Sequence, residues 1–189
     1  TAFSLTDQHI YIGGNFTHMQ GANSKVVYTR AAGRVNLDGT PDPTWNPEFN
    51  GTVMDIDTSP AGDKFYAAGF FTKSAGRTAI KAAILSTEPG ANPIGDWVFK
   101  GSASERGNYQ QTIDDTGKLL FIGGSEHSLF GYDRDGLQRV SGSITIPIGG
   151  DMQATATDGD VAYAGCHCSA NSYENAYLWP SPAEDWSRV

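Results

Sequence analysis

The sequence has few cysteines, few basic residues and no long apolar run. Its 189 residues include two cysteines, and 13 Lys or Arg stand against 21 Asp or Glu, which gives a net charge of −8. Two cysteines are too few to build a disulfide scaffold. The basic residues are scattered singly, so we expect no nucleic-acid-binding surface. No apolar stretch approaches the roughly 18 residues that a membrane-spanning helix needs, so we predict no membrane span.

Motifs that would indicate catalysis are absent as well. The sequence contains no Gly-x-Ser-x-Gly elbow, no Ser and His in a paired context and no glycine-rich phosphate loop. It also shows no sustained helical period of apolar residues, so we expect little helix. We therefore predict that the chain is not an enzyme and that it binds no cofactor and no metal.

What the sequence does contain is glycine, 23 residues in all, and a motif in which an aromatic strand runs into glycine. The motif occurs at residues 11–14, 66–69, 121–124 and 163–165. The first three aromatic residues are 55 positions apart and the fourth follows after 42, a spacing typical of repeat architectures. We predict that one glycine of each motif occupies an equivalent place in successive sheets, where a Cβ would meet a neighbouring backbone or φ is positive: Gly13, Gly69, Gly123 and Gly165.

Short strands joined by tight turns surround each motif. The expected strands are residues 9–14, 30–37, 53–57, 64–69, 80–85, 110–113, 118–123, 128–132 and 161–165. The first repeat is expected to keep only its return strand and its outer strand. Trp45 and Trp97 lie 52 residues apart and are predicted to be structural equivalents, each buried between its own sheet and the next.

Three to four short strands in each repeat of roughly 50 residues match the dimensions of a propeller blade. We therefore predict an all-β fold, a β-propeller or propeller-like array of about four antiparallel blades. Residues 1–189 would form one repeat region, with repeats centred near residues 11, 66, 121 and 163, as a fragment of a larger propeller truncated at both ends.

Four stretches of the first two repeats carry a resemblance to a known family. They are Gly13-Gly14-Asn15-Phe16-Thr17, residues 34–45, Asn50-Gly51-Thr52-Val53 and Ser59-Pro60-Ala61-Gly62. The pattern resembles the delta-60 type of bacterial β-propeller repeat, and it degenerates in the third and fourth repeats. The resemblance implies a propeller fold and a secreted, surface-attached or phage-tail setting. It implies no catalytic residues.

Cys166-His167-Cys168, in the fourth repeat, is a candidate for a disulfide. Adjacent residues on an extended strand point to alternating faces, so His167 lies away from both sulfur atoms. Two thiolates alone leave a tetrahedral ion half-coordinated, so we expect no metal here. A disulfide between Cys166 and Cys168 would require the chain to bend and an oxidising compartment. The alternative is two buried thiols that pack as small apolar groups.

Other polar patterns are explained by structure as well as by function. Residues 133–136 resemble the start of a calcium loop, but no bidentate Glu follows, and a β-turn accounts for them. Asp114-Asp115 and Glu184-Asp185 could be glycosidase acids, yet adjacent residues in a strand or turn diverge. Asn15 and Asn50 begin N-glycosylation patterns, both at positions that define the repeat.

Aromatic residues gather near the end of the sequence. Their flat faces could stack on sugar rings, or they could pack against a following repeat. They are Tyr173, Tyr177, Trp179 and Trp186.

These features favour a non-enzymatic interaction module of a larger extracellular, cell-surface or virion protein, used for adhesion, receptor contact or assembly. Its partner would be a protein or a cell-surface glycan, bound by loops such as residues 17–29 and 86–96. The alternative is a domain of an extracellular carbohydrate-active enzyme whose catalytic residues lie outside this sequence. A convergent pair of buried carboxylates would favour that alternative.

Overall fold

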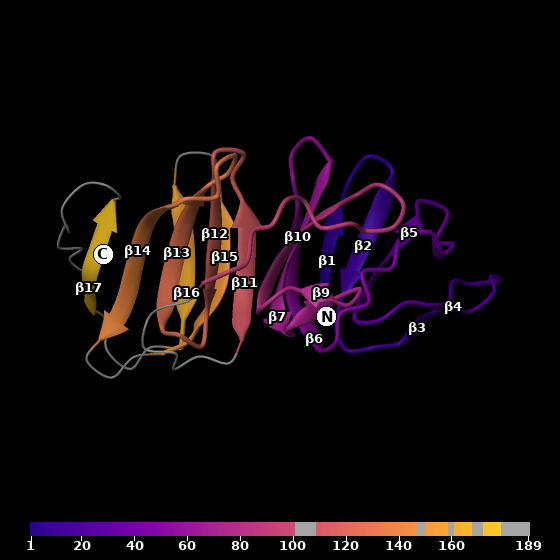
Figure 1. The fold of residues 1–189 in the computed structure, drawn as a ribbon, viewed down its shortest axis with the longest axis horizontal. Helices are drawn as coiled ribbons and strands as arrows, with labels where there is room; N and C mark the ends of the chain where they lie inside the picture. The colour runs from indigo at the N-terminus through magenta and orange to yellow at the C-terminus, as the bar shows by residue number, and fades with distance from the viewer. Residues whose placement is uncertain (101–108, 147–149, 159–160, 168–171, 179–189) are drawn as a thin grey trace. The chain divides into compact units, whose positions relative to one another are not determined.

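The computed structural model describes residues 1–100, 109–146, 150–158, 161–167 and 172–178 (Figure 1). The described residues form antiparallel strands and no helix, which confirms the predicted all-β class. None of them therefore belongs to a helix long and apolar enough to cross a membrane. The chain divides into two compact units, Thr1–Lys100 and Gly101–Val189.

The first unit contains two three-stranded sheets and two short hairpins. The first sheet has the order β1-β2-β5, the second has the order β10-β7-β6, and the hairpins are β3-β4 and β8-β9. The strands are β1 (Ala2–Leu5), β2 (His9–Gly13), β3 (His18–Met19), β4 (Val27–Tyr28), β5 (Ala32–Asn36), β6 (Thr52–Thr58), β7 (Lys64–Phe70), β8 (Lys73–Ser74), β9 (Arg77–Thr78) and β10 (Ala82–Ser86).

One expectation about the first repeat is wrong. Its first strand is present: β1 pairs antiparallel with β2 from Ala2 opposite Gly13 to Leu5 opposite Ile10. The strand is only four residues long, and its two large apolar residues, Phe3 and Leu5, flank a serine. So short an alternation gives a weak strand signal in the sequence.

The two sheets of the first unit are built alike, down to individual backbone bonds. In each repeat the return strand is β2 or β7 and the outer strand that pairs with it is β5 or β10. The outer strand is preceded by a residue with φ of 64°, Ala31 in the first repeat and Lys81 in the second. Each of these residues exchanges two backbone hydrogen bonds with the end of the return strand and the residues after it. The bonds are Gly14 N to Ala31 O at 2.8 Å, Ala31 N to Phe16 O at 2.8 Å, Gly69 N to Lys81 O at 2.9 Å and Lys81 N to Phe71 O at 2.9 Å.

In both repeats, the segment that connects the return strand to the outer strand is closed by the same backbone hydrogen bond. Thr29 N donates to Thr17 O at 3.2 Å in the first repeat, and Ala79 N donates to Thr72 O at 3.0 Å in the second. A two-stranded hairpin rises from each base, β3-β4 in one and β8-β9 in the other. The segment predicted as a polar loop at residues 17–29 is therefore a hairpin excursion.

The two sheets stack face to face. A Cβ on Gly13 would lie 2.7 Å from Val53 Cγ1 and 2.8 Å from Ile56 Cγ2, so β2 and β6 approach closely only because glycine stands there. Beside this contact the hydroxyls of Ser4 and Thr58 form a 2.7 Å hydrogen bond between the sheets. The apolar core of the unit lies between these two faces.

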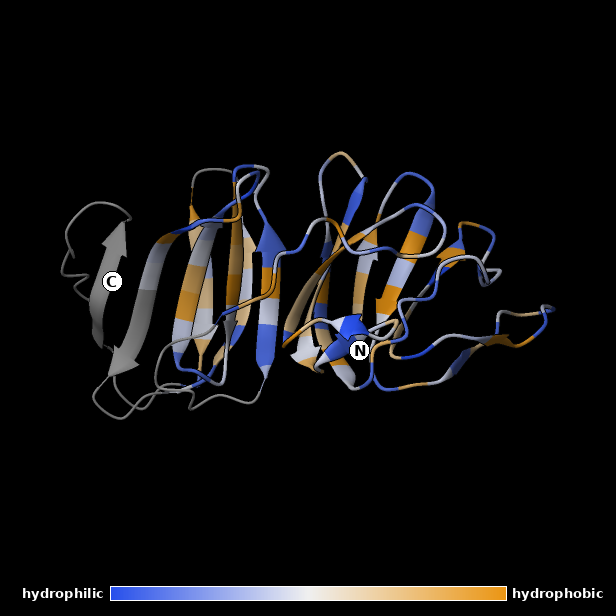
Figure 2. Ribbon diagram, viewed as in Figure 1, coloured by the Kyte–Doolittle hydropathy of each residue, from blue (hydrophilic) through white to orange (hydrophobic). Residues whose placement is uncertain are grey.

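The described residues of the second unit form one larger sheet and one hairpin. The sheet has the order β11-β12-β13-β14-β17, and the hairpin is β15-β16. The strands are β11 (Gln110–Asp115), β12 (Leu119–Gly124), β13 (Ser128–Asp133), β14 (Arg139–Ile146), β15 (Met152–Thr157), β16 (Ala162–Cys166) and β17 (Ser172–Leu178). Of these, β14, β15 and β17 are not among the strands expected from the sequence. Figure 2 shows hydrophobic positions recurring along the strands.

The stacking contact of the first unit recurs in the second. A Cβ on Gly123 would lie 2.7 Å from Met152 Cβ, just as one on Gly13 would meet Val53. The hydroxyls of Thr112 and Thr155 lie 2.6 Å apart across the same pair of sheets. In both units the face that carries the repeat's aromatic residue and glycine therefore packs against the next sheet in the chain.

The other two repeat glycines are placed differently. Ala68, fully buried, pairs with Ala82 as Gly13 pairs with Ala32, so Gly69 lies one residue later in its strand than Gly13 does. A Cβ on Gly69 would meet the backbone of Thr52. At Gly165 the nearest atom would be Ala154 Cβ at 3.7 Å, an ordinary contact.

Candidate functional site

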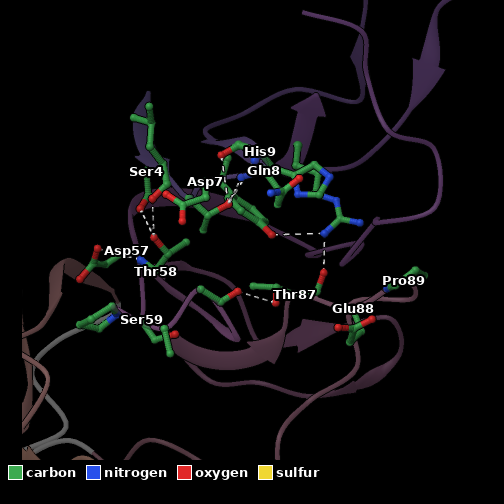
Figure 3. Close-up of a pocket in the computed structure, with 17 residues that line it drawn as sticks. Ser4, Asp7, Gln8, His9, Asp57, Thr58, Ser59, Thr87, Glu88 and Pro89 are labelled. Atoms are coloured by element: carbon green, nitrogen blue, oxygen red, sulfur yellow. Dashed lines mark hydrogen bonds between the residues drawn. The ribbon is translucent and has the colours of Figure 1, made fainter. Parts of the chain in front are cut away.

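An open pocket of about 930 Å³ lies in the first unit (Figure 3). Three segments line it: residues 4–9, which carry the turn from β1 to β2, residues 57–62 at the end of β6 and in the turn after it, and residues 87–89 after β10. Tyr11 and Arg34 complete the lining. The pocket is therefore built from turns and strand ends of both sheets of this unit.

Arg34 is a buried cation in the floor of the pocket, with 5% of its surface exposed. Its Nη2 and Nε donate to Asp42 Oδ2 at 2.7 Å and 2.8 Å. Its Nη1 donates to the Tyr11 hydroxyl at 3.2 Å and also to the carbonyl of Thr87. Arg34 thus ties the first sheet to the segment that follows the second sheet.

Aromatic rings support the guanidinium. Arg34 Cζ lies 6.0 Å from the centroids of both the Tyr11 and the Trp45 rings, within cation–π distance. Tyr11, Trp45 and Phe65 pack mostly edge to face, with centroids 4.8–5.4 Å apart. Trp45 is fully buried, and its Nε1 donates to Ser86 O at 2.9 Å. The pocket floor therefore rests on the buried apolar core.

These contacts shift three pKa values. Burial raises the pKa of Asp42, but hydrogen bonds from Thr44 and Arg34 and the charge on Arg34 outweigh it, and the pKa is lowered overall. Burial also raises the pKa of the Tyr11 hydroxyl, against an opposing hydrogen bond from Arg34. Burial and the charge on Arg34 lower the pKa of His9, although Asp42 acts in the opposite direction.

His9 stands at the edge of this network and lines the pocket. Its Nε2 lies 4.0 Å from Asp42 Oδ2, and 22% of its side chain is exposed. Its lowered pKa favours the neutral imidazole, which can both donate and accept a hydrogen bond. Figure 3 shows His9 beside Gln8 on the pocket wall.

The carboxylates of the pocket lining are not buried. Asp7 and Glu88 are exposed, and Asp57 is half-buried. Asp57 Oδ1 accepts a hydrogen bond from Thr58 N at 2.7 Å. The described lining therefore lacks the pair of buried carboxylates expected of a glycosidase.

No local pattern in the sequence singles out Arg34, Asp42 or His9 as a site residue. The signal that could have found two of them is the repeat itself. Arg34 pairs with Tyr11 as Ile84 pairs with Tyr66, and Asp42 N donates to Arg34 O as Ile94 N donates to Ile84 O. An ion pair in the first repeat thus stands where the second repeat has two isoleucines.

Of the two predicted tryptophans, Trp45 is buried and Trp97 is half-buried. Each follows by four residues a proline that forms a bridge to the outer strand of its repeat, Pro41 to Val35 and Pro93 to Leu85. Trp97 packs edge to face on Phe99, with centroids 6.3 Å apart. The two residues therefore occupy matching places in the chain path and differ in burial.

The structure separates the predicted acidic residues. Asp133 Oδ2 accepts a hydrogen bond from Gly136 N at 2.6 Å and Asp133 O accepts one from Leu137 N at 2.9 Å, so this carboxylate stabilises a turn. Asp115 pairs with Arg134 at 2.9 Å, whereas burial raises the pKa of its neighbour Asp114, against a hydrogen bond with Thr157. Among the described residues, no three His, Cys, Asp or Glu side chains come together in a metal-binding arrangement.

The remaining candidates lie at or beyond the edges of the described residues. Cys166 ends β16, but Cys168 is outside the described residues, so the disulfide stays a prediction. Four further candidates also lie outside the described residues: Trp179, Glu184, Asp185 and Trp186. Tyr173 and Tyr177 lie on β17.

The two glycosylation patterns differ in what surrounds the asparagine. Asn15 is exposed. Asn50 fixes the loop after β7: its Oδ1 accepts from Thr72 N and Lys73 N at 2.8 Å and 2.9 Å. The amide of Asn50 therefore has a structural role.

Comparison with protein-family models and with curated protein sequences finds no match to this chain.

Proposed function

We propose that the chain is a non-enzymatic interaction module of β-propeller or propeller-like architecture, part of a larger extracellular, cell-surface or phage-tail protein. The repeated strand and hairpin plan of the first unit and the recurrent stacking contact of the second support this architecture. Its function is adhesion, receptor contact or assembly.

The pocket of the first unit is the proposed recognition site, and the observation that carries this is its polar rim over a buried floor. Arg34, the cation of the floor, is already neutralised by Asp42. The rim offers the amide of Gln8, the imidazole of His9 and the carboxylate of Glu88. Such groups hydrogen-bond the hydroxyls of a sugar, whereas the carboxylates of the pocket lining repel an anion. The ligand class is therefore a neutral glycan.

The lining also argues for binding without hydrolysis. Glycoside hydrolysis requires two carboxyl groups, one of them with a raised pKa, on either side of the scissile bond. Asp7 and Glu88 are exposed and Asp57 is half-buried, so the described lining does not hold two buried carboxyl groups that face each other.

A panel of neutral oligosaccharides, screened on an array and confirmed by titration calorimetry, tests the proposal. Gln8→Ala and Glu88→Gln are expected to weaken binding about tenfold each, the loss of one to two hydrogen bonds. Asp96→Asn changes an exposed carboxylate of the same unit outside the pocket and should bind as wild type does.

Two results would contradict the proposal. Binding that is indifferent to Gln8 and Glu88 would place the ligand elsewhere. Release of shorter sugars from a bound oligosaccharide would show that the chain is an enzyme.

A further inference from the structure

The two hairpin segments of the first unit carry positive charge and no negative charge. They are residues 14–31, between β2 and β5, and residues 71–81, between β7 and β10 (Figure 1). Together they hold five of the chain's 13 Lys and Arg and none of its 21 Asp and Glu. The five are Lys25, Arg30, Lys73, Arg77 and Lys81. In a chain with a net charge of −8, this concentration of cations sets the hairpin segments apart.

The sheets do not require these segments. In the third repeat the return strand β12 is joined to the outer strand β13 by residues 125–127 alone, which contain no Lys or Arg. His127, with φ of 58°, precedes the outer strand there, as Ala31 and Lys81 do in the first two repeats. The hairpin segments are therefore additions to the sheet framework. Such additions are where recognition residues are commonly found.

Asn50 brings cations of both segments together. Arg30 Nη2 donates to Asn50 O at 3.3 Å. Lys73 N donates to Asn50 Oδ1 at 2.9 Å, and Asn50 N donates to Lys73 O at 3.1 Å. Arg77 lies on the strand that pairs with the strand of Lys73. We call Arg30, Lys73 and Arg77 the hairpin cations.

The hairpin cations are exposed, and among the described residues none of the three forms an ion pair with a carboxylate. Two other arginines differ in this respect, because Arg34 pairs with Asp42 and Arg134 pairs with Asp115. An exposed cation without an internal partner can hydrogen-bond an anionic group of a ligand. The hairpin cations are thus available to such a ligand.

Acidic residues lie at the opposite end of the strands. Asp7 lies between β1 and β2, Asp63 lies between β6 and β7, and Glu88 follows β10. The hairpin segments leave from the other ends of β2 and β7. The pocket, which Asp7 and Glu88 line, is therefore at the acidic end of the unit. A polyanion is repelled there and attracted by the hairpin cations.

We infer that the hairpin cations bind an acidic polysaccharide through carboxylates carried on successive sugars. The cations are spread over two segments, which suits charges spaced along a chain better than one compact anion. Nucleic acid requires a denser row of cations, because a duplex carries one charge per about 1.7 Å of its axis. The forked guanidinium of Arg30 or Arg77 matches a carboxylate. The exposed hydroxyl of Thr78, which pairs with Lys73, can hydrogen-bond a sugar hydroxyl.

Polygalacturonate, which carries one carboxylate on each sugar, is the probe. It should bind at low salt and more weakly as NaCl is raised. Its methyl ester has the same sugars without the charge and should not bind. Lys73→Gln and Arg77→Gln should each weaken binding about three- to fivefold, the loss of one exposed ion pair. Lys118→Gln removes an exposed lysine of the second unit and should bind as wild type does. Biolayer interferometry measures all of these.

Glu48 provides a variant with the opposite effect. It is exposed and follows Pro47, whose carbonyl accepts a hydrogen bond from Ala75 N of the β8-β9 hairpin at 2.9 Å. Glu48→Gln removes a negative charge beside the hairpin cations, so it should bind polygalacturonate about twofold tighter. Unchanged or weaker binding by this variant would mean that the polysaccharide lies elsewhere.

Four further results would overturn the inference. They are no binding of polygalacturonate at low salt, equal binding of its methyl ester, an equal loss in Lys118→Gln, which would mean that net charge alone matters, and binding of polyglutamate or oligodeoxythymidylate at least as tight, which would indicate an acidic protein or a nucleic acid as the partner. The inference is independent of the neutral-glycan pocket. Gln8→Ala should therefore bind polygalacturonate as wild type does, and Lys73→Gln should keep any binding of neutral oligosaccharides.

Discussion

Arg34 and Asp42 form a buried ion pair in which two guanidinium nitrogens, Nη2 at 2.7 Å and Nε at 2.8 Å, donate to one carboxylate oxygen. Their side chains are 5% and 12% exposed. Asp42 Oδ1 accepts two further bonds from Thr44, from the backbone N at 2.8 Å and from the hydroxyl at 2.6 Å. Both oxygens of the carboxylate are thus used, and the pair fixes the chain between β5 and Trp45.

Asp42→Ile should destabilise the fold by about 3–5 kcal/mol, because it leaves the Arg34 charge buried and unpaired. The double variant Arg34→Ile/Asp42→Ile reproduces the Ile84 and Ile94 arrangement of the second repeat and should be more stable than the single variant. Urea unfolding measures both. A double variant no more stable than Asp42→Ile would show that Arg34 matters for its bonds to Tyr11 and Thr87 and not for its charge.

His9 should make stability depend on pH below its ordinary pKa of 6.5. Its folded-state pKa is lowered, so the unfolded chain takes up a proton first as the pH falls. The free energy of unfolding therefore decreases as the pH drops from 6.5 through the folded pKa. His9→Gln should flatten this part of the urea-midpoint profile, and His18→Gln, at an exposed histidine, should not.

Asp42 acts in a more acidic range. Its folded-state pKa lies below the ordinary value of 3.8, so its stabilising contribution is present above that value and is lost as the pH falls through the folded pKa. Asp42→Asn should therefore lose less stability on acidification than the wild type does. Equal losses would show that other carboxylates dominate acid unfolding.

Trp45→Ala should cost about 3–5 kcal/mol, as expected for deletion of a large core side chain. Trp45 is fully buried against Tyr11 and Phe65 and donates a hydrogen bond to Ser86 O. Trp97→Ala is the matched comparison and should cost clearly less, because Trp97 is half-buried. Thermal and urea unfolding of both variants give the two values, and equal costs would contradict the difference in burial.

Gly13→Ala and Gly123→Ala should each destabilise the stack by about 1–3 kcal/mol, the usual cost of overpacking. The new Cβ would lie 2.7 Å from Val53 Cγ1 in one variant and 2.7 Å from Met152 Cβ in the other. Gly165→Ala is the control, since its Cβ would meet nothing closer than 3.7 Å. A large loss of stability at Gly165 would mean that steric clash is not what selects glycine at these places.

The central strands follow from the sequence because each combines large apolar residues with a terminal glycine and is bounded by turn residues. β7 and β12 agree with the prediction to within one residue at each end. β14 contains Ser141, Gly142 and Ser143, which weaken a strand signal, and it is held between β13 and the distant β17. Such non-local pairing leaves no trace in local pattern.

The pocket could not be predicted from local sequence pattern for a similar reason. Its lining comes from three segments that are far apart in sequence, and its key pair joins Arg34 to Asp42 across a turn. The pair can be recognised in the sequence only when the first repeat is aligned with the second, because Arg34 then aligns with Ile84 and Asp42 with Ile94. The paired aspartates at Asp114 and Asp115, which local pattern does show, diverge into different environments.

The hairpin excursions of the first unit have one base and two lengths. Between β3 and β4 the chain runs through residues 20–26, whereas Ala75 and Gly76 alone join β8 to β9. The same backbone hydrogen bond closes both hairpin segments, from Thr29 N to Thr17 O and from Ala79 N to Thr72 O. The sheet structure is therefore independent of hairpin length. The hairpins can therefore differ in length and sequence while the backbone hydrogen bonds that join them to the sheets stay the same.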